Sequence, residues 1–155
     1  MRGDEMDYLF TVHTLAWRDG EMLLREVREA VFMREQGVSA ELEWDGLDEA
    51  CRHVLAINKK GQAIACGRIT AQGKIGRMAV LPEWRGKQVG SAVLGALLSA
   101  ARSRELVRVE LAAQTQVAGF YERHGFKKVG EIFMDAGMPH IMMQCTISPA
   151  NTAET

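Results

Sequence analysis

The apolar positions of this chain repeat with two periods, and each change of period predicts a new element. Segments rich in β-branched and aromatic residues predict strands, whereas apolar residues spaced three and four apart predict helices. The predicted strands lie at residues 8–16, 52–58, 62–70, 74–81, 107–112, 126–133 and 139–146. The predicted helices lie at residues 19–37, 88–102 and 116–124. This order is typical of a mixed α+β fold with a helix directly after a glycine-bearing turn.

Two of the predicted helices carry a clear apolar stripe. One face of the first holds Leu24, Val27, Val31 and Arg34, and Gly37 supplies its end. The stripe of the second is formed by Val89, Val93, Leu97 and Ala101, and is widened by Leu94 and Leu98. Between the first helix and the next strand, the acidic residues 41–48 predict an irregular segment.

Composition narrows the class of protein. With 155 residues, 47% hydrophobic and 25% charged, the chain has the size and make-up of one soluble domain. We expect that domain to span residues 1–148, with a short polar tail at 149–155. A net charge of −1 argues against nucleic-acid binding, and no apolar run is long enough for a membrane span. The acidic N-terminus lacks the pattern of a signal peptide, so the expected location is cytoplasmic.

The three cysteines point to the same reducing location. Cys51, Cys66 and Cys145 are an odd set without a C-x-x-C pair, and the last two lie in apolar, strand-like runs. We interpret them as reduced cysteines that act as small hydrophobic residues.

The most informative segment is the turn between the strand at 74–81 and the helix at 88–102. Helix N-termini offer unpaired N–H groups and the positive end of the helix dipole. Gly86 and Gly90 allow a ligand to approach the backbone, and Arg85 and Lys87 add positive charge. Neither a P-loop nor the three-glycine dinucleotide turn is present. The turn is suited to a pyrophosphate, although the alternative of an ordinary capped surface turn stays open.

Two motifs identify a family resemblance. Residues 85–90, Arg-Gly-Lys-Gln-Val-Gly, resemble the acyl-CoA signature Gln/Arg-x-x-Gly-x-Gly/Ala of the GNAT N-acetyltransferase superfamily. Residues 120–126, Phe-Tyr-Glu-Arg-His-Gly-Phe, resemble the second hallmark of that family. Residues 31–38, 43–48, 52–56 and 137–143 resemble its ElaA-like branch. One departure is Gln88, which holds the place of the middle glycine of the signature and should tilt one N–H group.

The resemblance implies a fold and a cofactor. The fold is a mostly antiparallel central sheet of about six or seven strands, flanked by helices and holding a splayed parallel pair. Acetyl-CoA is implied to enter between the strand that ends at Leu81 and the strand at 107–112. Backbone groups of Met78 and Val80 would bind its pantetheine arm like an added strand. N–H groups from Lys87 to Ser91 would bind its pyrophosphate. The implied cofactor residues are Met78, Ala79, Val80, Arg85, Gly86, Lys87, Gln88, Val89, Gly90, Ser91, Gln114 and Tyr121.

Tyr121 is the catalytic candidate. The matching tyrosine of the family lies near the thioester sulfur and protonates the departing thiolate. A phenol with an ordinary pKa of about 10 stays protonated at neutral pH and can therefore act as a general acid. The alternative is a helix tyrosine that only covers the core.

The reaction also needs a way to neutralise the acceptor amine. Candidates for acceptor binding or for the base are Glu35, Glu43, Asp45, His53, His140 and Glu110. Glu43 and Asp45 are close together in the acidic segment and could bind a cationic amine, but paired loop acids are commonly solvated or capping. The two histidines titrate near neutral pH, but a lone histidine on an apolar strand is commonly structural. None of these residues has the spacing of a metal site.

Three functions follow from these residues. The first is transfer of an acetyl group from acetyl-CoA to a primary amine of a small molecule or peptide. The second is an acyl-homoserine-lactone-type synthase, which shares this sheet and a similar N-terminal half. The third is a CoA-binding module without turnover. By family habit the chain is also expected to form a homodimer.

Overall fold

One seven-stranded sheet runs through the protein, with the strand order β1-β2-β3-β4-β5-β7-β6. The structure, a computed structural model, describes residues 8–147. Every pair of neighbouring strands is antiparallel except β4 and β5, which are parallel. The strands are β1 Phe10–Ala16, β2 Arg52–Asn58, β3 Ala63–Ile69, β4 Lys74–Val80, β5 Arg108–Gln114, β6 Lys127–Asp135 and β7 Met138–Thr146. The predicted fold class is therefore confirmed. The expected tail at 149–155 lies outside the described residues.

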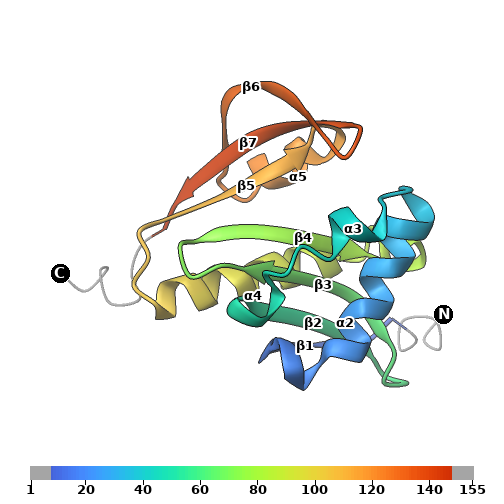
Figure 1. Cartoon of the computed structure of the whole chain (residues 1–155). Coiled ribbons are helices and arrows are strands. Elements are labelled where there is room, and N and C mark those ends of the chain that lie inside the picture. The colour runs from blue at the N-terminus through green and yellow to red at the C-terminus, as the bar shows by residue number, and fades with distance from the viewer. Residues whose placement is uncertain (1–7, 148–155) are drawn as a thin grey trace.

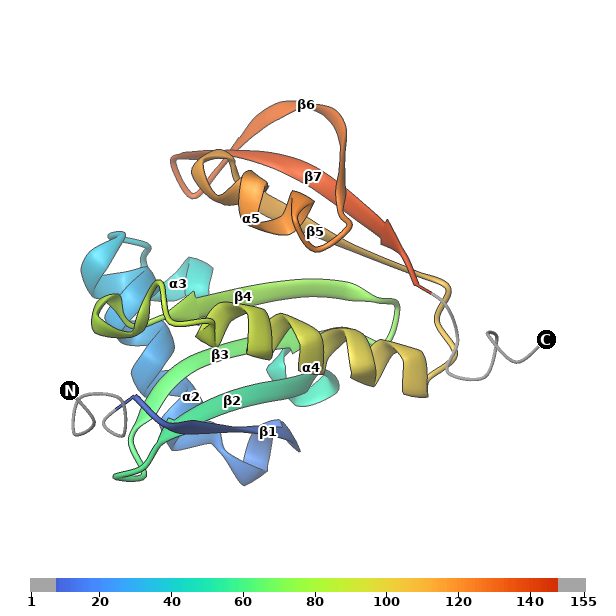
Figure 2. The same cartoon turned by 180° about the vertical axis from the view of Figure 1, so that it is seen from behind.

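Helices cover both faces of the sheet (Figure 1). Figure 2 shows α4, Val89–Ser103, and α5, Ala118–Glu122, on the face opposite to α2, Glu21–Arg28. Two apolar cores result. The larger lies under α4, where the six predicted stripe residues are all buried. The smaller lies under α2 and includes Trp17, Leu24 and Val27. The amphipathic pattern thus predicted which face of each helix meets the sheet.

The first helix differs from its prediction. It continues beyond α2 as a π-helix, Glu29–Glu35, whose wider turn shifts the register of its side chains. Val31 is buried as expected, but Arg34, predicted on the same face, is exposed. Arg28 is instead almost completely buried. A constant period of 3.6 residues therefore described only the first two turns of this helix.

The acidic segment is more ordered than its sequence suggested. Residues Ala40–Glu43 form the short helix α3, and the Ser39 hydroxyl accepts a hydrogen bond from the Leu42 N–H at its start. A single 3₁₀ turn follows at Asp48–Ala50. Glu43 belongs to α3 rather than to a loop, so the expectation of an irregular segment at 41–48 was wrong for its first part.

The parallel pair β4–β5 is joined over a very short stretch. Only Lys74 and Ile75 of β4 pair with β5, opposite Glu110 and Leu111. Beyond them the two strands separate, and both views show β5, β7 and β6 diverging from β4 (Figures 1 and 2). The predicted splayed pair is confirmed, and one side of the remainder of β4 has no neighbouring strand within residues 8–147.

Candidate active site

The separated part of β4 carries a bulge at Arg77 and Met78, whose side chains lie on opposite faces of the sheet. Cys66 pairs with Ala79 and Arg68 with Gly76, so Gly67 faces two residues of β4, Arg77 and Met78. Arg77 adopts a left-handed conformation with φ of 52°. Its side chain extends toward α3, whereas Met78 packs over Gly67 on the α4 side. A Cβ at Gly67 would lie 2.8 Å from Leu97 Cδ1, so a larger residue there would force the Leu97 side chain to shift.

Tyr121 lies across the separation from this bulge. Its hydroxyl is 3.5 Å from Met78 Sδ, and its ring contacts Phe120 and Phe126 edge-on. The residue comes from α5, which follows β5, so the contact joins the two diverging parts of the sheet. Burial raises the pKa of Tyr121 to about 12. The phenol therefore keeps its proton through the whole physiological range, as a general acid requires.

The turn before α4 presents backbone rather than side chains. Gly86 and Gln88 both have positive φ, 75° and 67°. Gln88 is the N-cap of α4, but its side chain makes no capping hydrogen bond. The N–H groups of the first helical turn, from Val89 on, have no carbonyl partner inside the helix. With the positive end of the helix dipole, they form a site with the chemistry that a pyrophosphate needs.

The two basic side chains of the turn have other partners. Arg85 donates to both carboxylate oxygens of Glu35, at 2.9 and 2.7 Å, and to the carbonyl oxygen of Val80 at 2.9 Å. Lys87 Nζ lies 4.5 Å from the ring centre of Tyr8. The Arg85 hydrogen bond lowers the pKa of Glu35, which therefore stays ionised at neutral pH. These contacts tie the turn to the N-terminal half of the chain, and Glu35 is engaged rather than free.

Gln114 ends β5 at the open side of the separation. Its Nε2 donates to Gln36 Oε1 at 3.0 Å, while its Oε1 accepts from Gln116 at 2.7 Å. Gln36 follows directly after Glu35, so two adjacent residues contact both walls of the site, the turn before α4 and the end of β5. Sequence reasoning missed Gln36, because a single polar residue at a helix end carries no local signal for a partner so far along the chain.

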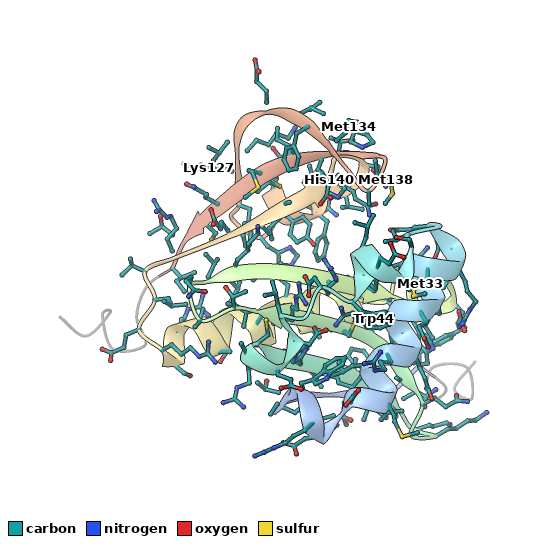
Figure 3. All side chains as sticks on the ribbon, viewed as in Figure 1. Met33, Trp44, Lys127, Met134, Met138 and His140 are labelled. Atoms are coloured by element: carbon teal, nitrogen blue, oxygen red, sulfur yellow. The ribbon has the colours of Figure 1, made fainter. Side chains whose placement is uncertain are left out.

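Glu43 and Asp45 belong to a network that sequence reasoning did not foresee. Three arginines and three carboxylates form it: Arg28, Arg68, Arg77, Glu43, Asp45 and Asp48. Figure 3 shows Trp44, from the same segment, beside α2, and its ring lies 4.7 Å from the Arg28 guanidinium carbon. One hint was available in the sequence, since each of these arginines directly follows an apolar residue or glycine in a strand or helix.

The network already neutralises both acids that were expected to bind a cationic amine. Glu43 is buried and accepts from Arg28 Nε at 2.7 Å. Burial raises the pKa of Glu43, and the hydrogen bond from Arg28 opposes that rise. Burial would also raise the pKa of Asp45, but hydrogen bonds from Arg68 and from the Leu47 N–H lower it to about 2. Glu43 and Asp45 therefore do not form a solvent-facing pair. Their ion pairs with arginines fit the alternative interpretation, in which the two acids have a structural role.

The remaining acceptor candidates also have defined places. His53 is buried, and its Nε2 donates to the Asp48 carbonyl at 2.9 Å, while burial lowers its pKa. His140, labelled on β7 in Figure 3, donates from Nδ1 to the Met138 carbonyl at 2.8 Å and stacks on Phe133. Glu110 lies where β4 and β5 still pair, at the closed end of the separation. Within residues 8–147, none of these three residues is hydrogen-bonded to Tyr121.

Other chemistries find little support in the described part of the chain. The three cysteines are buried and free, as expected of small hydrophobic residues. No group of three His, Cys, Asp or Glu side chains within residues 8–147 is arranged to hold a metal ion. Over the same residues, no helix has the length and apolar character of a membrane span.

Comparison with known proteins gives the same answer as the geometry. The family profile described as "Acetyltransferase (GNAT) domain" matches residues 24–147, which include the splayed parallel strands and the turn before α4. The N-acetyltransferase YjcF of Bacillus subtilis, itself uncharacterised, is 37% identical over 121 residues, covering 76% of this chain and 86% of YjcF. The chain therefore belongs to the GNAT acetyltransferase family.

The ElaA-like resemblance is likewise confirmed. Protein ElaA of Escherichia coli is 31% identical over 128 residues, which cover 77% of this chain and 83% of ElaA. The crystal structure of ElaA superposes with a TM-score of 0.78 over 88% of this chain and 99% of that one. An aminoglycoside 6'-N-acetyltransferase complexed with coenzyme A shares the fold at 15% identity, with a TM-score of 0.71 over 90% of this chain and 98% of that one.

Proposed function

We propose that this protein transfers an acetyl group from acetyl-CoA to a primary amine of a small molecule or peptide. One observation carries the proposal: the Tyr121 hydroxyl lies 3.5 Å from Met78 Sδ, across the separation of β4 from β5. A buried phenol at this place lies beside the strand whose free side a pantetheine arm would occupy. The membership of the GNAT family supports the use of acetyl-CoA.

The residues around the separation fit such a cofactor. The free side of β4 near Met78 and Val80 offers backbone groups to an extended arm, as an added strand would require, and the arm would share or displace the hydrogen bond that the Val80 carbonyl accepts from Arg85. The turn at residues 86–91 offers N–H groups to a pyrophosphate, and Gly86 leaves open space beside its backbone. Gln114 lies at the open end of the separation. Its side-chain amide would contact the cofactor in place of its present hydrogen bond to Gln36.

The chemistry follows from these positions. Bound acetyl-CoA supplies a thioester, whose carbon–sulfur bond breaks as the acceptor nitrogen forms a bond to the acetyl carbon. Tyr121 donates its phenol proton to the departing sulfur and recovers a proton from solvent. Glu35, Glu43 and Asp45 are all paired with arginines, and Glu110 lies at the closed end of the separation. We therefore assign the proton lost by the amine to water rather than to a carboxylate.

Thiol release with a panel of amines tests the proposal. The Tyr121→Phe variant should lose about a hundredfold in kcat while keeping its affinity for acetyl-CoA, because only the proton donor is removed. Ser103→Ala removes a hydroxyl at the far end of α4 and should change neither quantity. Unchanged kcat in Tyr121→Phe would remove this residue from the mechanism.

Two further outcomes would redirect the assignment. If acetyl-CoA raises Tm but no amine accelerates thiol release, the protein is a CoA-binding module without turnover. Saturation at a hundred times Kd adds about 2.7 kcal/mol, which is easily seen in thermal unfolding. If S-adenosylmethionine and an acyl donor give a lactone product, the protein is an acyl-homoserine-lactone-type synthase and not an N-acetyltransferase.

A further inference from the structure

Arg77 adopts a backbone conformation that a strand residue seldom takes. Its φ of 52° lies in the left-handed region, where a Cβ atom crowds the backbone and glycine is favoured. A bulge whose first residue is left-handed ordinarily has glycine there. The chain has a glycine one position earlier, Gly76, but the left-handed conformation falls on the arginine. The side chain of Arg77 must therefore stabilise a conformation that its backbone disfavours.

The guanidinium of Arg77 is anchored on four oxygens. Its Nη2 lies 3.1 Å from the carbonyl oxygen of Leu42, 3.0 Å from that of Glu43, and 3.2 Å from Asp45 Oδ2. Its Nε lies 3.1 Å from Glu43 Oε2. The two carbonyls belong to the end of α3, where carbonyl groups lack partners inside the helix and accept hydrogen bonds from basic side chains. Because α3 lies beside β4 (Figure 1), the anchor joins the helix to the bulge of the strand.

The carboxylates that hold Arg77 are themselves fixed. Glu43 is buried and accepts a hydrogen bond from Arg28 Nε at 2.7 Å. Asp45 accepts a hydrogen bond from Arg68 Nη1 at 3.0 Å. The side chain of Arg77 is only 24% exposed. Charge-assisted hydrogen bonds in such a partly buried place restrict the side chain, and they thereby restrict the bulge that carries it.

The bulge decides which way Met78 points. Two residues of β4, Arg77 and Met78, face the single residue Gly67 of β3. Without the extra residue, the register of β4 would slip by one position, and such a slip turns every following side chain to the other face of a sheet. The Met78 side chain, which packs over Gly67 on the α4 side, would then leave the Tyr121 hydroxyl that lies 3.5 Å from its Sδ. The conformation of Arg77 therefore sets the strand beside Tyr121.

We propose that Arg77 is a positioning residue for acetyl transfer: its anchor on α3 holds the bulge that aligns the free side of β4 with Tyr121. This inference rests on the proposed function. Arg77 acts only through the backbone of β4, because its side chain lies on the α3 side of the sheet. Glu43 and Asp45 then serve the reaction by holding Arg77 and not by binding the amine. A disfavoured conformation that the surrounding structure maintains is typical of places where a reaction needs a fixed geometry.

The Arg77→Gly variant separates the anchor from the backbone conformation. Glycine adopts a φ of this sign readily, so the bulge stays allowed, but the tie to α3 is lost. Because a misplacement of about 1 Å can cost about a hundredfold in rate, kcat for thiol release should fall at least about tenfold. The Kd for acetyl-CoA, measured by calorimetry, should change less than about threefold, because the turn before α4 is left intact. Arg77→Lys keeps a charge and a donor, and its kcat should lie between those of Arg77→Gly and the wild type.

Asp48→Asn is the matched control. It removes a charge from the same network, at a residue whose carboxylate accepts hydrogen bonds from Arg28 and Arg68. Like Arg77→Gly it should lower Tm, but its kcat should stay within about twofold of the wild type at a temperature where both variants are folded. Equal losses of kcat in the two variants would show that a loosened network, and not the anchor of Arg77, slows the reaction.

A double variant tests whether Arg77 acts through Tyr121. Once Tyr121→Phe has removed the proton donor, Arg77→Gly should cost little more, so the two losses in kcat should not multiply. If Arg77→Gly does not fold, Arg77→Lys takes its place in the same comparison. Losses that multiply, or a wild-type kcat in both Arg77 variants, would overturn the inference. A wild type that releases thiol with no amine would instead overturn the proposed function, and this inference with it.

Discussion

Arg77 Nη2 lies 3.0 Å from the carbonyl oxygen of Glu43, and this contact ties the left-handed bulge of β4 to the end of α3. The same nitrogen donates to the carbonyl of Leu42 at 3.1 Å. This contact holds β4, the strand that we assign to cofactor binding, through a side chain on the α3 side of the sheet. A residue that points away from the separation thus fixes the backbone beside it.

Replacing Arg77 should loosen this attachment. Arg77→Met keeps much of the apolar stem but leaves Glu43 and Asp45 short of one positive charge. Removal of one partner from a partly buried network costs about 1–3 kcal/mol of unfolding free energy. Urea denaturation measures the loss, and Arg34→Met, an exposed arginine of the π-helix, should stay within about 0.5 kcal/mol of the wild type. Equal stability of the two variants would contradict a structural role for Arg77.

Acid should destabilise the protein through Asp45. Hydrogen bonds from Arg68 and the Leu47 N–H outweigh burial and hold the pKa of Asp45 at about 2, below its ordinary value of 3.8. A carboxyl whose pKa is lowered by folding contributes stability above its unfolded pKa and loses it as pH falls through its folded pKa. Because Asp45 is largely exposed, solvent screening limits this contribution to about 1 kcal/mol, and the loss should fall between about pH 4 and pH 2.

The Asp45→Asn variant isolates this effect. It should be less stable at neutral pH, and its unfolding free energy should fall less steeply between about pH 4 and pH 2 than that of the wild type. Asp19→Asn, a change at an exposed carboxylate, should leave the acid slope as it is. If Asp45→Asn and the wild type show parallel slopes, the stabilising ion pair with Arg68 does not exist in solution.

Gln88 is strained where the family signature has glycine. Its φ of 67° costs a residue with a side chain about 1–2 kcal/mol, whereas glycine loses about 0.4–1 kcal/mol through its freer unfolded chain. Gln88→Gly should therefore leave stability unchanged or raise it by about 1 kcal/mol. Ala92→Gly, in the interior of α4, should cost about 1 kcal/mol. Thermal unfolding of both variants gives the comparison, and a marked loss in Gln88→Gly would mean that its side chain has a stabilising contact.

The pH profile of the reaction should rise without a falling limb. Burial raises the pKa of Tyr121 to about 12, so the acid keeps its proton throughout the accessible alkaline range. The acceptor amine, in contrast, becomes reactive only as it loses its proton. kcat/KM should therefore increase tenfold per pH unit up to the pKa of the amine and then stay level, measured by thiol release. A descending limb below about pH 10 would show that a different acid is used.

The sequence predicted local features well and long-range pairing poorly. The stripe of α4 was predicted residue by residue, because Val89, Val93 and Leu97 repeat with the period of the helix that buries them. The separation of β4 from β5 was expected only through the family resemblance. No periodicity of single strands reports how far two of them stay paired.

The arginine–carboxylate network shows the limit most clearly. Arg28 pairs with Asp48, twenty residues away, and Arg68 donates to the same oxygen of that carboxylate. Each charge taken alone resembles a solvated residue, and only the folded chain brings opposite charges to one place. The same reason explains why the acids of this segment were considered for amine binding.

The separation of β4 from β5 also divides the chain into two pieces that could be made apart. Strands β1 to β4 pair among themselves, as do β5, β7 and β6, and only two residue pairs join the groups. The link between α4 and β5, residues 104–107, is largely exposed. A cut there would leave nearly every strand pair inside one fragment or the other. The protein is thus suited to reassembly from two fragments, whose interface would be formed by the buried side chains of α4 and α5.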